Sequence, residues 1–173
     1  MIKLPYLPES REIFYVSKDN PFIIAAEQTA KNFSSDYMQS TGAVIVKDGF
    51  IVGEGANQSF LKHPALQNLH RRGLCIRKFL KIKSGTKYWL CLGCSGHKSH
   101  AEARAVLNAR TKGIDVSLAD LYLWGHWWCC KSCWDIIIKA GIKNVYLLEG
   151  SEKFFNFNSP EHILGKRSDN EQV

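Results

Sequence analysis

The chain has 173 residues, of which 45% are hydrophobic and 23% charged. This composition is ordinary for one soluble globular domain with a proper core, and no apolar run approaches the length of a membrane span. The six cysteines fall in two regions rather than in a disulfide framework, and no export signal opens the chain. We therefore expect a cytoplasmic protein whose cysteines bind metal.

The net charge of +7 belongs to one segment of the chain. Between Ala56 and Ala101 there is no Asp or Glu, so the rest of the chain carries a charge of −2. Nine basic residues supply the excess: Lys62, Arg71, Arg72, Arg77, Lys78, Lys81, Lys83, Lys87 and Lys98. Such a segment favours a phosphate-bearing partner. A solvated basic face is the alternative.

The first predicted elements are a lead-in and a helix. Residues 1–19 contain two prolines and predict an irregular or partly extended lead-in. Asn20-Pro21 predicts a helix start, because Asn caps free N–H groups and Pro suits the first helical position. We expect this helix to run to Tyr37 or Met38.

A β-hairpin is predicted next. Residues 43–46 and 50–53 are rich in β-forming residues, and Asp48-Gly49 joins them. The second run continues into Gly53-Glu54-Gly55-Ala56-Asn57, where the glycines allow a sharp turn or a close approach to a ligand. Spacing alone favours a turn-capping role for Asn57.

Residues 58–99 form an insertion that is long for a loop in a compact domain, which favours a functional or metal-stapled segment. Cys91 and Cys94 have the spacing of a zinc knuckle, and Cys75 with one histidine would complete a closed four-ligand structural zinc site. Three histidines can supply that ligand: His63, His70 and His97. His97 is our candidate for the fourth ligand of this second zinc site. Three buried cysteines with surface histidines are the alternative.

Two short motifs carry the strongest chemical signal: His100-Ala101-Glu102 and Cys130-Lys131-Ser132-Cys133. Each opens an apolar run typical of a helix, and two ligands three apart in a first turn share one face. His100, Cys130 and Cys133 form a three-ligand set that leaves a tetrahedral zinc one open position. The helix N-terminus favours both sulfurs as thiolates. Glu102 is placed to handle protons beside the metal rather than to bind it.

Each motif has a simpler interpretation when it stands alone. A single C-x-x-C pair also occurs in redox sites and as half of a structural zinc site. A single histidine at a helix start is commonly a cap or a surface residue. Here the ligands and the carboxylate occur in order, and H-x-E…C-x-x-C is the signature of zinc deaminases acting on cytosine or adenine. A structural zinc protein that has lost activity is the alternative.

The remaining elements predict a parallel crossover. Residues 121–124 and 144–148 have the pattern of strands, and the Cys130 helix lies between them. Gly113 and Gly141 predict the ends of the two helices that carry the metal motifs. Strand–helix–strand units of this length are connected as right-handed parallel crossovers.

Over roughly residues 20–150 the chain resembles the cytidine and deoxycytidylate deaminase superfamily. The resemblance rests on His100-Ala101-Glu102, on the Cys130 and Cys133 pair, and on residues 53–57. The insertion, with Gly73-Leu74-Cys75-Ile76-Arg77-Lys78 and Lys83-Ser84-Gly85-Thr86-Lys87-Tyr88 ahead of Cys91, is similar to that of the deoxycytidylate (dCMP) deaminases. The chain therefore resembles this branch most.

The resemblance implies a three-layer α/β/α fold with a mixed central sheet, a catalytic zinc and a second, structural zinc in the insertion. It implies that Asn57 holds the substrate sugar and that the Ala101 backbone contacts the base. We expect one domain over residues 1–173 that forms a homo-oligomer and binds a small nucleotide, with no membrane partner. The chain departs from the family's usual pattern at Cys129, which replaces proline, and at residues 97–99, which lengthen the loop.

These observations predict a hydrolytic deaminase that converts dCMP to dUMP, with Glu102 as general acid and base. Trp127 or Trp128 would stack on the base, unless either is simply core. Three arginines are candidates for a 5′-phosphate contact: Arg71, Arg72 and Arg77. A deaminase of a base in RNA or single-stranded DNA is one alternative, in which the basic insertion follows backbone phosphates. A non-catalytic nucleic-acid-binding zinc protein is another, against which Glu102 argues.

Overall fold

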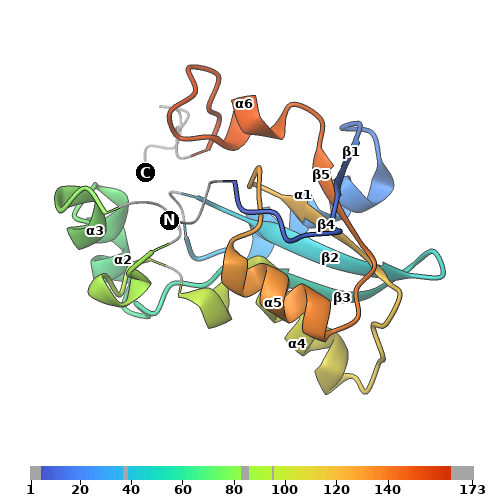
Figure 1. Ribbon diagram of the computed structural model, residues 1–173. Coiled ribbons are helices and arrows are strands. Elements are labelled where there is room, and N and C mark those ends of the chain that lie inside the picture. Colours follow the sequence, from blue (N-terminus) through green and yellow to red (C-terminus); the bar gives the residue numbers. More distant parts are fainter. Residues whose placement is uncertain (1–4, 37–38, 83–85, 95, 165–173) are drawn as a thin grey trace.

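The computed structural model describes residues 5–36, 39–82, 86–94 and 96–164 (Figure 1). The strands are β1 (Ile13–Val16), β2 (Gly42–Lys47), β3 (Phe50–Ala56), β4 (Asp120–Trp124) and β5 (Asn144–Leu148). The α-helices are α1 (Pro21–Phe33), α2 (Pro64–Arg71), α3 (Ile76–Phe79), α4 (Ala101–Thr111), α5 (Lys131–Lys139) and α6 (Ser151–Phe155). Two 3₁₀ turns complete the order, η1 (Tyr88–Leu90) and η2 (His97–Ser99).

The strands form one mixed sheet in the order β1-β5-β4-β2-β3. β1, β5 and β4 run parallel to one another, whereas β2 is antiparallel to both β4 and β3. The hairpin predicted from Asp48-Gly49 is β2–β3, and the predicted crossover is β4–α5–β5 with its two strands parallel. The expected mixed sheet is therefore confirmed.

Helices cover both faces of this sheet. In β2, Ala43 and Ile45 pack in a core with residues of α4 and α5, whereas Val44 and Val46 pack in a second core with residues of α1 and α6. This alternation follows from the two-residue period of a strand. The expected three-layer α/β/α architecture is confirmed.

The start of α4 lies directly against β3. A Cβ atom at Gly55 would lie 2.4 Å from the backbone nitrogen of Ala105, and one at Gly53 would lie 2.7 Å from the Ala105 oxygen. Both glycines are therefore needed because backbone meets backbone there, and not because a ligand approaches. This close contact fixes the height of His100 and Glu102 above the sheet.

One prediction about the N-terminal part needs correction. The helix that begins at Asn20, whose side chain accepts from the N–H groups of Phe22 and Ile23, ends at Phe33 rather than at Tyr37 or Met38. Ser34 leaves the helix in an extended conformation, and its hydroxyl hydrogen-bonds to Asn57. The lead-in, predicted to be irregular or partly extended, contains the short edge strand β1. Within the described residues, none of the helices is both long and apolar enough to cross a bilayer.

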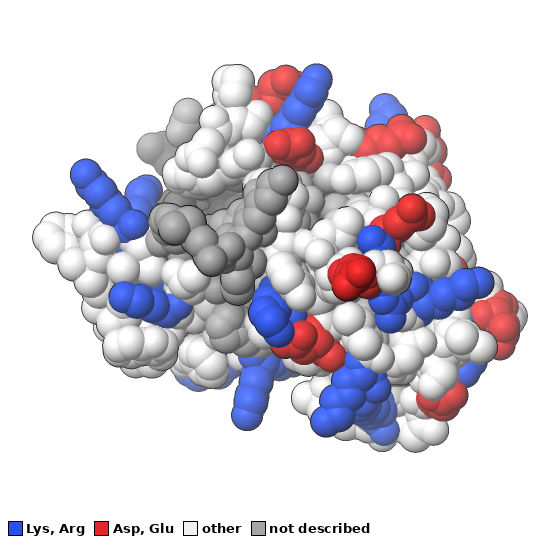
Figure 2. All heavy atoms as spheres, viewed as in Figure 1, with Lys and Arg blue, Asp and Glu red and all other residues white. Residues whose placement is uncertain are grey.

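The insertion folds as α2, α3, η1 and η2 beside the sheet. Figure 2 shows Lys and Arg side chains over the α2–α3 end of the molecule, with no Asp or Glu among the atoms visible there. The uneven charge of the sequence is thus localised at one end of this face.

Candidate metal centre and active site

His100, Cys130 and Cys133 meet where α4 and α5 begin. The ligand atoms of the three residues all lie within 4.8 Å of one another. His100 Nδ1 is 3.3 Å from Cys133 Sγ and 3.6 Å from Cys130 Sγ. Ligands of a tetrahedral zinc ion stand about 3.5 Å apart, so this donor set fits zinc and leaves a fourth position for water or substrate.

Neither His100 nor Cys130 uses its side chain to cap the helix that it begins. His100 is the N-cap residue of α4 and Cys130 is that of α5, and neither side chain makes a capping hydrogen bond. Both have the extended backbone conformation that is usual for an N-cap residue. Cys133 follows in the first turn of α5 and is fully buried.

The hydrogen bond between Cys130 and Cys133 shifts the pKa values of the two thiols in opposite directions. The hydrogen bond from Cys133 lowers the pKa of Cys130 to about 2, and His100 acts in the same direction. The same hydrogen bond, together with burial, raises the pKa of Cys133 well above its usual value. A metal ion that binds here would displace the proton of Cys133 and be held by two thiolates and a neutral imidazole.

Glu102 lies beside this set with only 5% of its surface exposed. Burial raises the pKa of its carboxyl group, while the charge of His100 acts in the opposite direction. Cys129 is fully buried next to Glu102 in the α4–α5 core, and it is not part of the metal-ligand group. Burial raises the pKa of the Cys129 thiol, which keeps it protonated.

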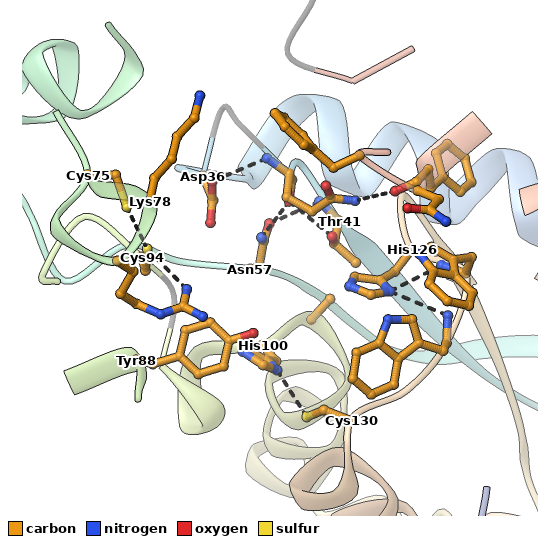
Figure 3. A pocket seen from close by; sticks show the side chains of 18 of the residues that line it. Asp36, Thr41, Asn57, Cys75, Lys78, Tyr88, Cys94, His100, His126 and Cys130 are labelled. Carbon is orange, nitrogen blue, oxygen red and sulfur yellow. Dashed lines mark hydrogen bonds between the residues drawn. The ribbon is translucent and has the colours of Figure 1, made fainter. Parts of the chain in front are cut away.

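A cavity of about 610 Å³ opens above these residues (Figure 3). His100, Ala101, Glu102 and Cys130 line its inner end. Its walls come from four groups of residues: Asp36, Gln39, Thr41 and Asn57; His70, Cys75, Arg77, Lys78, Ile82, Tyr88 and Cys94; His126, Trp127 and Trp128; and Phe155, Asn156, Phe157 and Asn158. Residues far apart in the sequence therefore surround one site.

Asn57 lies on the cavity wall, but most of its amide is used within the protein. Its Oδ1 accepts hydrogen bonds from the Thr41 backbone at 3.0 Å and from the Ser34 hydroxyl at 2.6 Å. Its Nδ2 donates to the Gln39 carbonyl oxygen at 2.8 Å. Among the described residues the second Nδ2 hydrogen has no hydrogen-bond partner, and the amide holds the turn at Gln39 and Thr41 as a cap would.

A second ligand group forms in the insertion from His70, Cys75, Cys91 and Cys94, whose ligand atoms also lie within 4.8 Å of one another. Cys94 Sγ is 3.6 Å from Cys75 Sγ and 3.7 Å from His70 Nε2. Four protein ligands of this kind suit a closed structural zinc site.

The histidine of this group is His70. His97 was the residue predicted as the fourth ligand, and its side chain lies outside the part that the structure describes. His63 is the N-cap of α2, where its Nδ1 accepts from the Ala65 N–H. His70 reaches the cysteines because α2 turns back on them, and a Cβ at Gly93 would lie only 2.1 Å from its ring. Spacing alone did not separate the three histidines.

The three arginines expected to contact phosphate differ in their surroundings. Arg77 lines the cavity but is only 9% exposed. Its Nε donates to the Thr86 carbonyl, its Nη1 lies 3.5 Å from Cys94 Sγ, and its guanidinium sits 4.1 Å above the Tyr88 ring. Arg72 is exposed and is not among the cavity-lining residues. The Arg71 side chain lies outside the described part.

Sequence reasoning missed several wall residues. Tyr88 contacts the His100 ring edge to face, with centroids 5.2 Å apart. Lys78 lines the cavity and lies over Phe157, with its nitrogen 5.4 Å from the ring centroid. His126 precedes the two tryptophans, both of which line the cavity. A histidine between a strand and a Cys pair was the one signal that could have drawn attention to it.

Comparison with known proteins gives one family match. The model of the cytidine and deoxycytidylate deaminase zinc-binding region matches residues 16–149, which includes both motifs of the inner cavity. Among curated proteins, none matches the chain at a significant level.

Several solved structures are similar to this chain. A diaminohydroxyphosphoribosylaminopyrimidine deaminase/5-amino-6-(5-phosphoribosylamino)uracil reductase of Thermotoga maritima shares 26% identity over 73% of this chain and 28% of its own, with a TM-score of 0.44. A dCMP deaminase of cyanophage S-TIM5 shares 20% identity over 73% of this chain and 78% of its own, with a TM-score of 0.45. A guanine deaminase of Bacillus subtilis shares 24% identity over 73% of this chain and 60% of its own, with a TM-score of 0.40.

The chain thus spans little more than a quarter of the Thermotoga protein and most of the cyanophage one. The family match extends over far more than half of the sequence. On that evidence the chain belongs to the family of cytidine and deoxycytidylate deaminases that share this zinc-binding region.

Proposed function

We propose that this protein is a zinc-dependent hydrolytic deaminase of a free nucleotide, converting dCMP to dUMP with release of ammonia. One observation carries the proposal: a buried carboxyl group, Glu102, lies beside a three-ligand metal set at the inner end of a cavity. A purely structural zinc site needs neither the open fourth position nor the neighbouring acid.

His100, Cys130 and Cys133 would hold the zinc ion, which when bound makes a water molecule nucleophilic near neutral pH. Glu102 accepts the proton of that water on its carboxylate and passes it to the ring nitrogen of the base. It then takes the proton of the hydroxyl group that has added to the base and gives it to the amine, which leaves as ammonia. Because burial raises its pKa, Glu102 is suited to both accepting and returning a proton.

The cavity walls support a nucleotide as the substrate. Ala101 and Asn57 both line the cavity, where the Ala101 backbone would contact the base and the Asn57 amide would donate to a sugar hydroxyl. Arg77 and Lys78 make one wall positive, which suits a 5′-phosphate. Arg77 is already engaged with Cys94 and Tyr88, so we assign the direct phosphate contact to Lys78.

We further propose that His70, Cys75, Cys91 and Cys94 hold a second, structural zinc ion. The support is the closed set of four ligand atoms and the absence of a carboxylate from that set. Arg77 next to Cys94 compensates the negative charge that thiolates would bring. This site would fix the insertion as one wall of the cavity.

A base within single-stranded nucleic acid is the second candidate substrate. The observation that favours it is a set of aromatic side chains exposed on the basic insertion, with Phe79 85% and Trp89 77% exposed. Aromatic platforms among positive charges are typical of single-strand binding.

The test is ammonia release from a panel of cytosine, adenine and guanine nucleosides, nucleotides and short single strands. Turnover of dCMP well above the other monomers supports the proposal. Turnover confined to strands, with binding that weakens steeply as salt rises, supports the polymer alternative. No ammonia from any substrate with a zinc-loaded protein contradicts both.

A further inference from the structure

His126 is held on the wall of the cavity by a segment with a fixed path. Residues 125–130 connect β4 to α5, and Gly125 has a φ of +87° that other residues rarely adopt. The Gly125 carbonyl accepts a hydrogen bond from Gln39 Nε2 at 2.7 Å, and a Cβ there would lie 2.1 Å from the Ser40 oxygen. The ring of His126 therefore starts from a well-defined point beside the cavity.

Hydrogen bonds determine which nitrogen of His126 carries the proton. Its Nδ1 accepts from the backbone N–H of Trp127 at 3.1 Å and from that of Trp128 at 3.4 Å. An accepting ring nitrogen has no proton, so the neutral imidazole carries its hydrogen on Nε2. Trp128 packs against the ring edge to face, with centroids 5.6 Å apart.

The Nε2–H group has no protein acceptor among the residues that the structure describes. Figure 3 shows the ring of His126 directed into the cavity, toward the space between Asn57 and His100. Burial lowers the pKa of His126 to about 4, and the charge of His100 acts in the same direction. The ring is therefore a neutral donor near the inner end of the cavity, where the base would lie.

We propose that His126 is a specificity-determining residue that donates its Nε2–H to a carbonyl oxygen of the substrate base. This inference rests on the proposed function. Cytosine carries such an oxygen next to the ring nitrogen that Glu102 would protonate, whereas adenine has none. A site built to hydrogen-bond a group discriminates against analogues that lack it, because its own donor is then left unpaired.

Two substitutions separate this role from a structural one. His126→Asn keeps an oxygen near the position of Nδ1, so the N–H groups of Trp127 and Trp128 retain an acceptor, but its amide is too short to replace Nε2. His126→Gln carries an amide nitrogen that reaches the position of Nε2. Zinc content and melting temperature of both variants report whether the fold and metal site are intact.

Specificity constants are measured for dCMP and for its 2-thio analogue, whose sulfur is a weak acceptor. His126→Asn should lower the value for dCMP by about 10-fold or more and change that for the thio compound much less, with His126→Gln in between. The same constants are measured for cytidylate, which differs from dCMP in the sugar, and for deoxycytidine, which lacks the phosphate. An equal fall with both bases, no fall, or a selective fall only in the sugar or phosphate arm overturns the assignment.

The same comparison can be made without turnover. Calorimetric titration with dUMP and 2-thio-dUMP tests the carbonyl contact on the product, which keeps the oxygen and has lost the amine. If the wild type prefers dUMP to 2-thio-dUMP, His126→Asn removes that preference and no ammonia is released, the proposed deamination is contradicted and the His126 contact is supported. Normal turnover with no selective effect of His126→Asn would do the reverse.

Discussion

At the scale of single residues, Glu102 is the group on which the proposed chemistry depends most directly. Glu102→Gln keeps the size of the side chain and removes its ability to accept a proton. We expect ammonia release to fall by about 10²–10⁴-fold or more while zinc content and stability are retained. Steady-state kinetics together with elemental analysis measure both. Near-normal turnover in this variant would show that another group moves the proton.

Arg77 and Lys78 are adjacent in sequence but differ in their contacts, which gives a matched pair. Lys78→Ala should lower the specificity constant for dCMP about 10-fold and leave that for deoxycytidine unchanged, because only a phosphate contact is lost. Arg77→Ala should impair both substrates and lower the melting temperature, since it removes a buried group from Cys94 and Tyr88. Kinetics with the two substrates distinguish them. Equal use of nucleoside and nucleotide by the wild type would contradict the phosphate contact.

The raised pKa of Cys133 makes zinc retention depend on pH. Without metal its thiol is protonated near neutral pH, so zinc binding releases that proton and tightens as pH rises toward the raised pKa. We expect affinity to increase about 10-fold for each pH unit and each proton released. Competition of the loaded protein with a chelator between about pH 6 and pH 8, corrected for the chelator's own protonation, measures the slope. A flat profile would show that both cysteines are already thiolates.

At the scale of secondary-structure elements, the contact between β3 and α4 leaves no room for a methyl group added at Gly55. Gly55→Ala forces the helix away from the strand, so we expect a loss of about 1–3 kcal/mol in unfolding free energy and weaker zinc retention. Gly49→Ala is the control. Its φ is +82° but nothing lies near its Cβ, so it should cost about 1 kcal/mol without changing metal retention. Denaturant titration and chelator competition compare them, and equal effects would contradict the packing argument.

Local patterns predicted most elements, and tertiary contacts decided what was missed. The helix start at Asn20, the hairpin turn at Asp48 and the two metal-motif helices follow from capping, turn chemistry and periodicity, all of which act within a few residues. The edge strand β1 is defined by its pairing with β5, which a short irregular segment does not reveal.

In the site, too, local sequence motifs predicted some residues and tertiary contacts determined the others. The H-x-E and C-x-x-C motifs predicted a common centre, and the structure places His100, Glu102 and Cys130 around one cavity. The selection of His70, the engagement of Arg77 with Cys94 and the exposure of His126 to the cavity depend on how the insertion and residues 125–130 fold against the sheet. No spacing rule carries that information.

At the scale of the whole molecule, the two ligand groups should respond independently to substitution. We expect two zinc ions per loaded chain. Cys91→Ser should lose one ion and lower stability, because it opens the insertion, while the ion at His100 remains. Elemental analysis with thermal unfolding tests this. A single zinc ion in freshly prepared wild type would argue against the second site.

The order of the ligands along the chain has a further consequence for how the molecule opens. His70 and Cys94 are 24 positions apart and His100 and Cys133 are 33 apart, and the first span ends before the second begins. Each bound ion acts as a crosslink that closes its own loop, worth roughly 3–4 kcal/mol if it resembles a disulfide. Since the loops do not interlock, one can open while the other stays closed. A chelator that reaches the insertion first would therefore remove the wall carrying Arg77 and Tyr88 while α4 and α5 remain joined on the sheet.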